Sequence, residues 1–187
     1  MTLDYVKSEI FNLGFEKESK YKDDKNIIIQ AINRAMTTIT TEVRPIVSEL
    51  VINDCSAGCF DLKLLASEQG YEYLALAAIE NGAMCELHGY ELKRGKILKI
   101  KSAEPIHIFY KRAPTVIQAD TPDNFVIELD SDVCILLSLL ACYYVWLDDD
   151  NGRKATIWYN DYETRRNGIL SNDKHTVAKV IGGGGYA

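Results

Sequence analysis

The residues best suited to chemistry in this sequence are two pairs of metal-ligand types. Cys55 and Cys59 have three residues between them, and Cys85 and His88 have two. Thiolates and imidazoles in pairs are the usual ligands of structural zinc. The wider gap of the first pair is unusual for zinc, and both pairs fall in segments predicted as strand or turn. We therefore expect buried or incidental thiols and no bound metal, and a metal-dependent enzyme is only our third hypothesis.

An acidic turn at residues 148–152, with the sequence DDDNG, has the composition of a calcium loop. An EF-hand loop needs acidic ligands at its first, third and fifth positions, glycine at the sixth and glutamate at the twelfth. Aligning the glycine in this way puts Leu147 first and Trp158 last, and neither side chain binds calcium. We therefore predict a solvated turn in which Asp150 or Asn151 caps the following helix.

The remaining polar residues give no catalytic pattern. The three histidines, His88, His107 and His175, are scattered, and no Ser–His–Asp or Cys–His pair can be placed. The glycine run at residues 182–185 is not a phosphate loop, because neither a helix nor a Lys-Ser/Thr pair follows it. We expect a protein that is not an enzyme and that needs no cofactor.

Charge and composition narrow the class of protein. A net charge of −6 over 187 residues argues against a basic reader of nucleic acid, whose phosphate contacts need clustered lysine and arginine. Five cysteines, an odd number without a secretory signal, indicate reduced thiols in a cytosolic setting. The longest apolar run, residues 133–147, is shorter than the roughly 20 residues of a membrane span, so we predict a buried helix and no membrane partner.

Two helices are predicted in the N-terminal part of the chain. The first covers residues 2–12, with Thr2 as its cap and Gly14 just after its end. In the second, apolar residues recur at steps of three and four, which places them on one helix face. This helix starts from a cap at Asp24 and stops before Pro45, because the residue that precedes a proline avoids helical geometry.

Two more helices are predicted in the C-terminal part. An extended segment at residues 125–129 leads into an apolar helix at 132–147. The last helix covers residues 153–167, and Gly168 provides its end cap. The four glycines near the end of residues 171–187 cannot hold regular structure alone, which predicts a flexible arm.

The segment between these helical parts, residues 46–114, has a different texture. Short apolar or alternating runs such as IVSELVI, CFDLKLLA and PIHIFYKRA are separated by turn residues at close spacing, which predicts antiparallel strands. Residues 91–95 and Asn81–Gly82 suit hairpin turns. Roughly six strands over this length suit a small sandwich or barrel, although the run YEYLALAAI also fits a helix.

The fold class that follows is α+β. We predict an antiparallel helical bundle built from two halves, residues 1–44 and 115–170, because each half carries an apolar stripe that must be covered. A small antiparallel β-sandwich or barrel module at residues 45–114 is inserted between the halves. Residues 171–187 form the flexible C-terminal arm.

The order of parts after the β module resembles the head–tail connector proteins of tailed phages, in particular the adaptor type. The resemblance rests on a strand that ends in the basic-x-Pro segment 111–114, a helix rich in leucine and aromatic residues at 136–146, the acidic turn, and the Trp/Tyr…Tyr-Glu pattern at 158–163. The upstream run NIIIQAINRAMTTI also resembles the early bundle helix of that group. The β module departs from the smallest, all-helical adaptors.

The resemblance implies a structural role in the virion neck, with assembly in the host cytoplasm. Adaptors of this type form a ring, usually a dodecamer, that docks beneath the portal protein, extends the DNA channel and receives the stopper or tail-completion protein. Double-stranded DNA then passes without specific contacts. Their C-terminal arms commonly reach into the portal or along the next subunit, and here that arm corresponds to residues 179–187.

Candidate site residues follow from the aromatic excess and from the resemblance. Aromatic residues beyond the needs of one core often mark protein–protein interfaces, although an aromatic core explains them equally well. An acidic wall would let DNA slide without sticking. The alternative function is another virion structural module, a tail or baseplate component whose β domain binds a partner or glycan. The interface candidates are Trp158, Tyr159, Tyr162, Arg165, Arg166, Lys179, Val180, Ile181 and Tyr186, and the channel-lining candidates are Asp148, Asp149 and Asp150.

Overall fold

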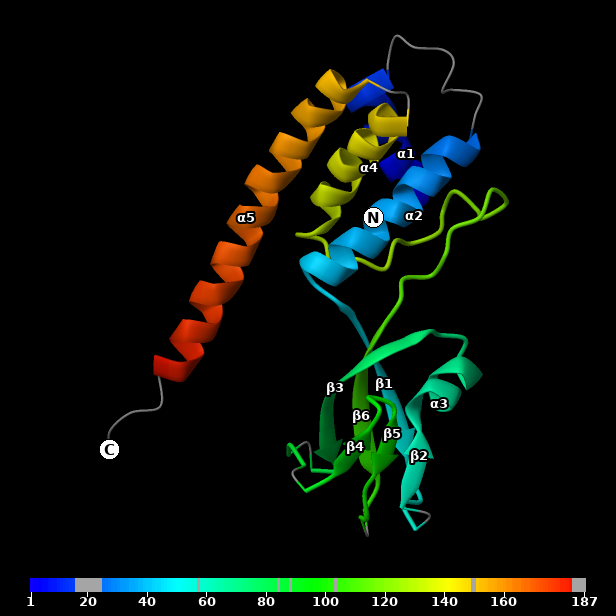
Figure 1. The fold of residues 1–187 in the computed structure, drawn as a ribbon, viewed down its shortest axis with the longest axis vertical. Coiled ribbons are helices and arrows are strands. Elements are labelled where there is room, and N and C mark those ends of the chain that lie inside the picture. Colours follow the sequence, from blue (N-terminus) through cyan, green and yellow to red (C-terminus); the bar gives the residue numbers. More distant parts are fainter. Residues whose placement is uncertain are drawn as a thin grey trace. The chain divides into compact units, whose positions relative to one another are not determined.

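The chain forms two compact units with mixed α+β structure (Figure 1). A computed structural model describes residues 1–15, 25–56, 58–83, 85–87, 89–102, 104–148 and 151–182, and it describes their side chains except at 14, 15, 25 and 173–182. The helical unit comprises Met1–Arg44 and Val116–Ala187, and the β unit comprises Pro45–Thr115. These boundaries lie within two residues of those predicted for the inserted module.

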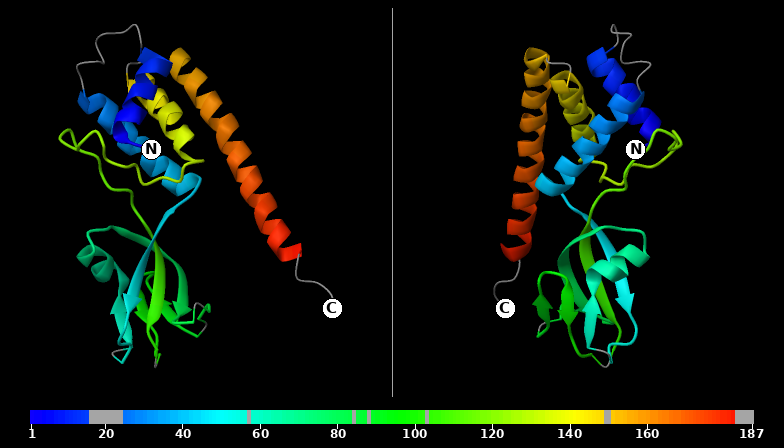
Figure 2. Two further views of the ribbon diagram at one scale, coloured as in Figure 1. Left: turned by 180° about the vertical axis from the view of Figure 1, so that it is seen from behind. Right: turned by 45° about the vertical axis from the view of Figure 1, so that its right-hand side comes forward.

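Helix α4 (Cys134–Asp148) is the central element of the helical unit (Figures 1 and 2). It packs against α1 (Leu3–Ile10), α2 (Lys25–Glu42) and α5 (Gly152–Gly182). Eleven of its 15 residues are buried, as expected for a helix that is apolar on every side. Among the described residues, no helix combines the length and the apolar character needed to span a membrane.

The N-terminus is fixed by a cap and by pairing with a distant segment. The Tyr5 amide donates to Thr2 Oγ1 at 3.4 Å, which confirms the predicted cap. Thr2 also forms an antiparallel bridge with Val126, inside the extended segment predicted at residues 125–129. The prediction that Gly14 ends the first helix is wrong, because α1 continues as a π-helical turn through Phe11–Phe15.

Helix α2 confirms the apolar stripe read from the sequence, since Ile28, Ile32 and Ile39 are all buried. Asn33 ties this helix to the segment that returns from the β unit. Its Nδ2 donates to the Ile117 carbonyl at 2.8 Å, and its Oδ1 accepts from the Ile117 amide at 2.9 Å. One side chain thus satisfies both backbone groups of a buried residue.

Helix α5 is longer than the sequence predicted. Asn151 caps its start, with Oδ1 accepting from the Lys154 amide at 3.3 Å, as anticipated. The expected end at Gly168 is wrong, because the helix runs without a break to Gly182. Within the predicted C-terminal arm, residues 171–182 are helical, and 183–187 lie outside the described residues. A glycine inside a helix costs about 1 kcal/mol relative to alanine, which neighbouring turns can offset.

The larger sheet of the β unit is antiparallel, with β6 (Ile106–Arg112) between β1 (Ile46–Ile52) and β3 (Tyr73–Asn81). The run YEYLALAAI is therefore a strand. Every second residue of β6 faces the core, where Ile106, Ile108 and Tyr110 are almost fully buried.

The smaller sheet has the order β2 (Cys59–Asp61), β5 (Ile97–Lys99) and β4 (Glu91–Lys93), also antiparallel. The expected strand CFDLKLLA is wrong after its third residue, because α3 (Leu62–Glu68) begins there. Asp61 caps this helix by accepting from the amides of Lys63 and Leu64. Both sheets and α3 contribute to one apolar core.

Candidate interaction surfaces

An aromatic seam joins α4 to α5. The ring centroids of Tyr143 and Tyr159 lie 5.0 Å apart, and those of Tyr159 and Tyr162 lie 6.0 Å apart. Tyr162 is only 1% exposed, so the prediction that it meets a partner is wrong. Burial, with the nearby Glu42 carboxylate as a smaller cause, raises the pKa of Tyr162 to about 12. Its hydroxyl has no hydrogen-bond partner among the described residues.

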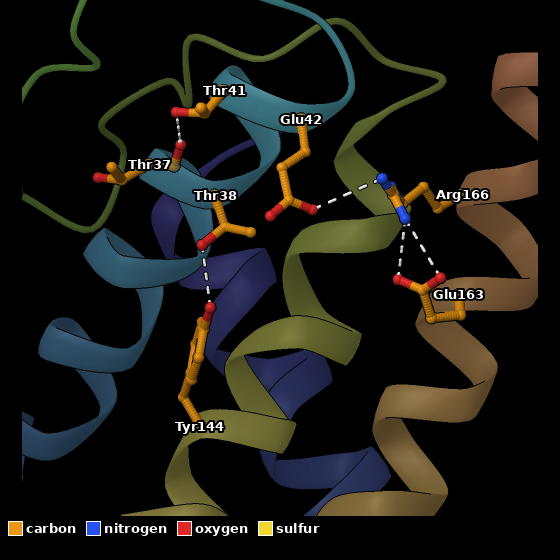
Figure 3. A network of polar contacts seen from close by, with 7 residues as sticks. All are labelled: Thr37, Thr38, Thr41, Glu42, Tyr144, Glu163 and Arg166. Carbon is orange, nitrogen blue, oxygen red and sulfur yellow. Dashed lines mark hydrogen bonds and ion pairs between the residues drawn. The ribbon is translucent and has the colours of Figure 1, made fainter.

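Arg166 connects α5 to α2 within the helical unit (Figure 3). Its Nη1 contacts the two carboxylate oxygens of Glu163 at 3.0 and 3.2 Å, and its Nη2 lies 3.7 Å from Glu42 on α2. Arg166, a predicted interface residue, is thus engaged within its own unit, and its side chain keeps 24% exposure. In the same network the hydroxyls of Thr38 and Tyr144 lie 2.9 Å apart, which joins α2 to α4.

Three of the predicted interface residues do reach solvent on α5. Tyr159 is 40% exposed, Trp158 is half-buried, and Arg165 is exposed with its guanidinium 3.4 Å from Asp161. Among the described side chains of this helix, Ile157 is the most exposed apolar one, at 60%, and the sequence did not single it out. The sequence did hold a signal for this exposure. Ile157 directly precedes Trp158, and adjacent residues on a helix face different directions, so the two do not share one face.

Of the remaining site candidates, the structure describes the side chain of Asp148 alone. Asp148 is exposed and lies 3.7 Å from Arg34, whose guanidinium also sits 4.1 Å above the Tyr144 ring. The backbone of α5 includes Lys179, Val180 and Ile181, but the structure does not describe their side chains. Three further candidates lie wholly outside the described residues: Asp149, Asp150 and Tyr186.

The possible metal ligands do not assemble in the described part of the chain. Cys55 is buried, Cys59 and Cys85 are exposed, and His88 lies outside the described residues. Within the described ranges, no three His, Cys, Asp or Glu side chains are placed to hold a metal ion. Burial raises the pKa of the Cys142 thiol to about 12, so this side chain packs as a neutral, small apolar group.

The β unit has a surface that the sequence reasoning did not single out. On β1, Val47 and Val51 are 49% and 45% exposed and face away from the core. Their cross-strand partners on β6 are Lys111 and His107, and His107 Nδ1 contacts the Glu49 carboxylate. We call this surface the outer sheet face. In the sequence, the alternation of residue types along the strand indicates that the strand has two faces. It does not show which of the two faces is covered.

Comparison with known proteins does not identify a function for this chain. No family model matches the chain, and no curated protein matches it.

Proposed function

We propose that this protein is a structural adaptor of a phage head–tail connector, which forms a ring beneath the portal, extends the DNA channel and joins the head to the stopper or tail. In this proposal, α1, α2, α4 and α5 form the antiparallel helical bundle, and the β unit is a sandwich-like insertion. The protein works by packing against copies of itself and against portal and tail-completion proteins, without catalysis.

The length of α5 is the observation that carries this proposal. Its 31 residues exceed the 15 of α4, its main packing partner, by 16 residues, or about 24 Å at 1.5 Å per residue. Helices in proteins draw most of their stability from the packing of one face against other elements. A neighbouring subunit or the portal would supply that packing for the C-terminal part of α5.

The order of elements supports the same reading. Strand β6 ends at Arg112, just before Pro114, and an extended link leads to the buried helix α4. Helix α4 ends at Asp148 and α5 begins at Gly152, and α5 carries exposed Ile157 and Tyr159. This sequence of strand, link, buried helix, acidic turn and one-sided aromatic helix is the order on which the adaptor resemblance rests.

The test is the morphology of particles assembled without this protein. We expect filled or leaking heads without tails in negative-stain images. Complementation with the full chain should restore tails, whereas a chain that ends at Asn172, which lacks the last third of α5, should not. Normal tailed particles in the absence of the protein would sink the proposal.

A second candidate function is favoured by the outer sheet face. The exposed Val47 and Val51 beside charged Glu49 and Lys111 suit a β module that binds a partner in a tail or baseplate. Locating the subunit in a virion map distinguishes the two functions, because the adaptor lies between portal and tail.

A further inference from the structure

The hairpin of β4 and β5 concentrates positive charge in an otherwise acidic chain. Residues 91–101, which we call the basic hairpin, contain five basic side chains and one acidic one, a net charge of +4 within a protein of net charge −6. A local field of this sign attracts anions even when the whole protein does not. The five basic residues are Lys93, Arg94, Lys96, Lys99 and Lys101.

The fold holds these charges outward on a fixed frame. Leu98 is completely buried in the core and Leu92 packs against it, so the alternate residues Lys93 and Lys99 face away. Arg94 has a φ of 51° and the glycine after it a φ of 69°, which is the geometry of a type I′ turn. The backbone of the hairpin therefore needs no reordering on binding, and only the side chains lose conformational freedom.

Most of this positive charge is uncompensated. The Glu91 carboxylate lies 3.5 Å from Lys93 and 4.0 Å from Lys99, so a single acid is shared by two ammonium groups. Within the described part of the chain, Arg94, Lys96 and Lys101 have no ion-pair partner. Several charges in excess of the nearby acids remain for a ligand.

The side-chain composition of the hairpin indicates the kind of ligand. Protein–protein interfaces are enriched in aromatic residues and depleted in lysine. Here four of the five basic residues are lysines, and the exposed large apolar side chains of the described residues include none from 91–101. The nearest along the chain is Tyr90, at 37% exposure. Lysine ammonium groups bind phosphates as point charges without requiring a fixed orientation.

We propose that the basic hairpin binds the phosphodiester backbone of double-stranded DNA, without reading its sequence. This site does not depend on ring formation or on a place in the virion. If the adaptor proposal also holds, the hairpin would act as a weak and reversible contact for passing DNA.

The test measures how tightly the full chain binds a fluorescein-labelled duplex of about 30 base pairs. The fluorescence anisotropy of the duplex gives the binding constant at salt concentrations between 50 and 200 mM. Each phosphate contact contributes a slope of about −0.9 to log K against log salt, so four contacts predict a roughly 150-fold loss across this range. The triple variant K96Q/K99Q/K101Q should reduce the slope by about 2.7 and weaken binding at 50 mM by at least tenfold.

A matched control separates a site from diffuse charge. The variant K111Q/R153Q/R165Q removes the same charge from exposed positions outside the hairpin, and it should bind within about twofold of the unaltered chain. Circular dichroism should show unchanged folding of both variants. No binding by the unaltered chain at 50 mM salt, or equal weakening by both variants, would overturn the proposal.

An acidic competitor distinguishes DNA from an acidic protein partner. We expect unlabelled duplex to displace the labelled duplex at a lower concentration of negative charge than poly-glutamate does. Stronger displacement by poly-glutamate would mean that the hairpin recognises acidic protein and would refute the assignment to DNA. None of these outcomes alters the expected tail morphology, so the two proposals can fail independently.

Discussion

Replacing Arg166 with alanine tests how α5 is held to the rest of the helical unit. The guanidinium contacts Glu163 at 3.0 and 3.2 Å on its own helix and Glu42 at 3.7 Å on α2. The Arg166 side chain is 24% exposed, and the side chains of Glu163 and Glu42 are 30% and 46% exposed. The network is therefore partly shielded from water but not buried.

The magnitude follows from that intermediate exposure. A fully exposed ion pair contributes about 0.2–1 kcal/mol, whereas a hydrogen bond to a charged group contributes about 1.5–3 kcal/mol. The two acids keep contact with water when the arginine is removed, so neither becomes an isolated buried charge. We expect Arg166→Ala to lower the free energy of unfolding by about 1–2 kcal/mol.

Urea unfolding followed by tryptophan fluorescence is the appropriate assay. The only two tryptophans, Trp146 and Trp158, both lie in the helical unit, so the signal reports this unit alone. The matched control is Arg165→Ala, whose exposed partner Asp161 is one turn away and whose loss should cost about 0–0.5 kcal/mol. Equal effects of the two substitutions would refute the view that Arg166 ties α5 to α2.

Three further predictions concern stability and composition. Tyr162→Phe removes a buried hydroxyl without a described partner, so unfolding at neutral pH should be unchanged or up to about 1 kcal/mol more difficult. The pKa of Tyr162 is about 12 in the folded chain and 10.0 for a free tyrosine, so the unfolded chain loses this proton first. The free energy of unfolding should therefore fall by on the order of 2 kcal/mol as the pH rises from about 10 to 12. Tyr162→Phe should weaken that fall. Asn33→Ala leaves the amide and carbonyl of Ile117 unpaired and should cost about 2 kcal/mol in urea unfolding, whereas a loss near zero would mean that water replaces the amide. Elemental analysis of the purified protein should find no stoichiometric zinc, and one zinc per chain would revive the metal hypothesis.

The sequence predicted most reliably those elements whose pattern is complete within a short window. The apolar helix at α4 and the stripe on α2 each bury a continuous set of residues, so composition or periodicity alone identifies them. The cap at Thr2 is equally local, because a side chain acts on the amide three residues later. Helix α3 was missed although Asp61 is a good cap, because its seven residues are too few for periodicity to outweigh the surrounding strand pattern.

The roles of the aromatic and basic residues on α5 could not be predicted in this way. Tyr162 and Arg166 were assigned outward roles because local spacing shows which residues share a face, not which face is covered. The burial of Tyr162 and the ion pair of Arg166 depend on residues of other helices, such as Glu42 on α2. The end of α5 was misjudged for a related reason, since Gly168 ends a helix only where the chain turns into the left-handed region.

Arg166 also marks a division within α5 that makes the adaptor proposal testable without a virus. The contacts of Tyr159, Tyr162 and Arg166 hold the first half of the helix to α2 and α4. If a second chain supports the remainder, a protein that ends at Asn172 should unfold in urea at nearly the same concentration as the full chain, because the described ties of Tyr159, Tyr162 and Arg166 are all kept. Its self-association in solution and its binding to a portal should both be lost. A truncated chain that is destabilised as much as Arg166→Ala would show that the end of α5 serves its own subunit, and the main argument for a ring would then fail.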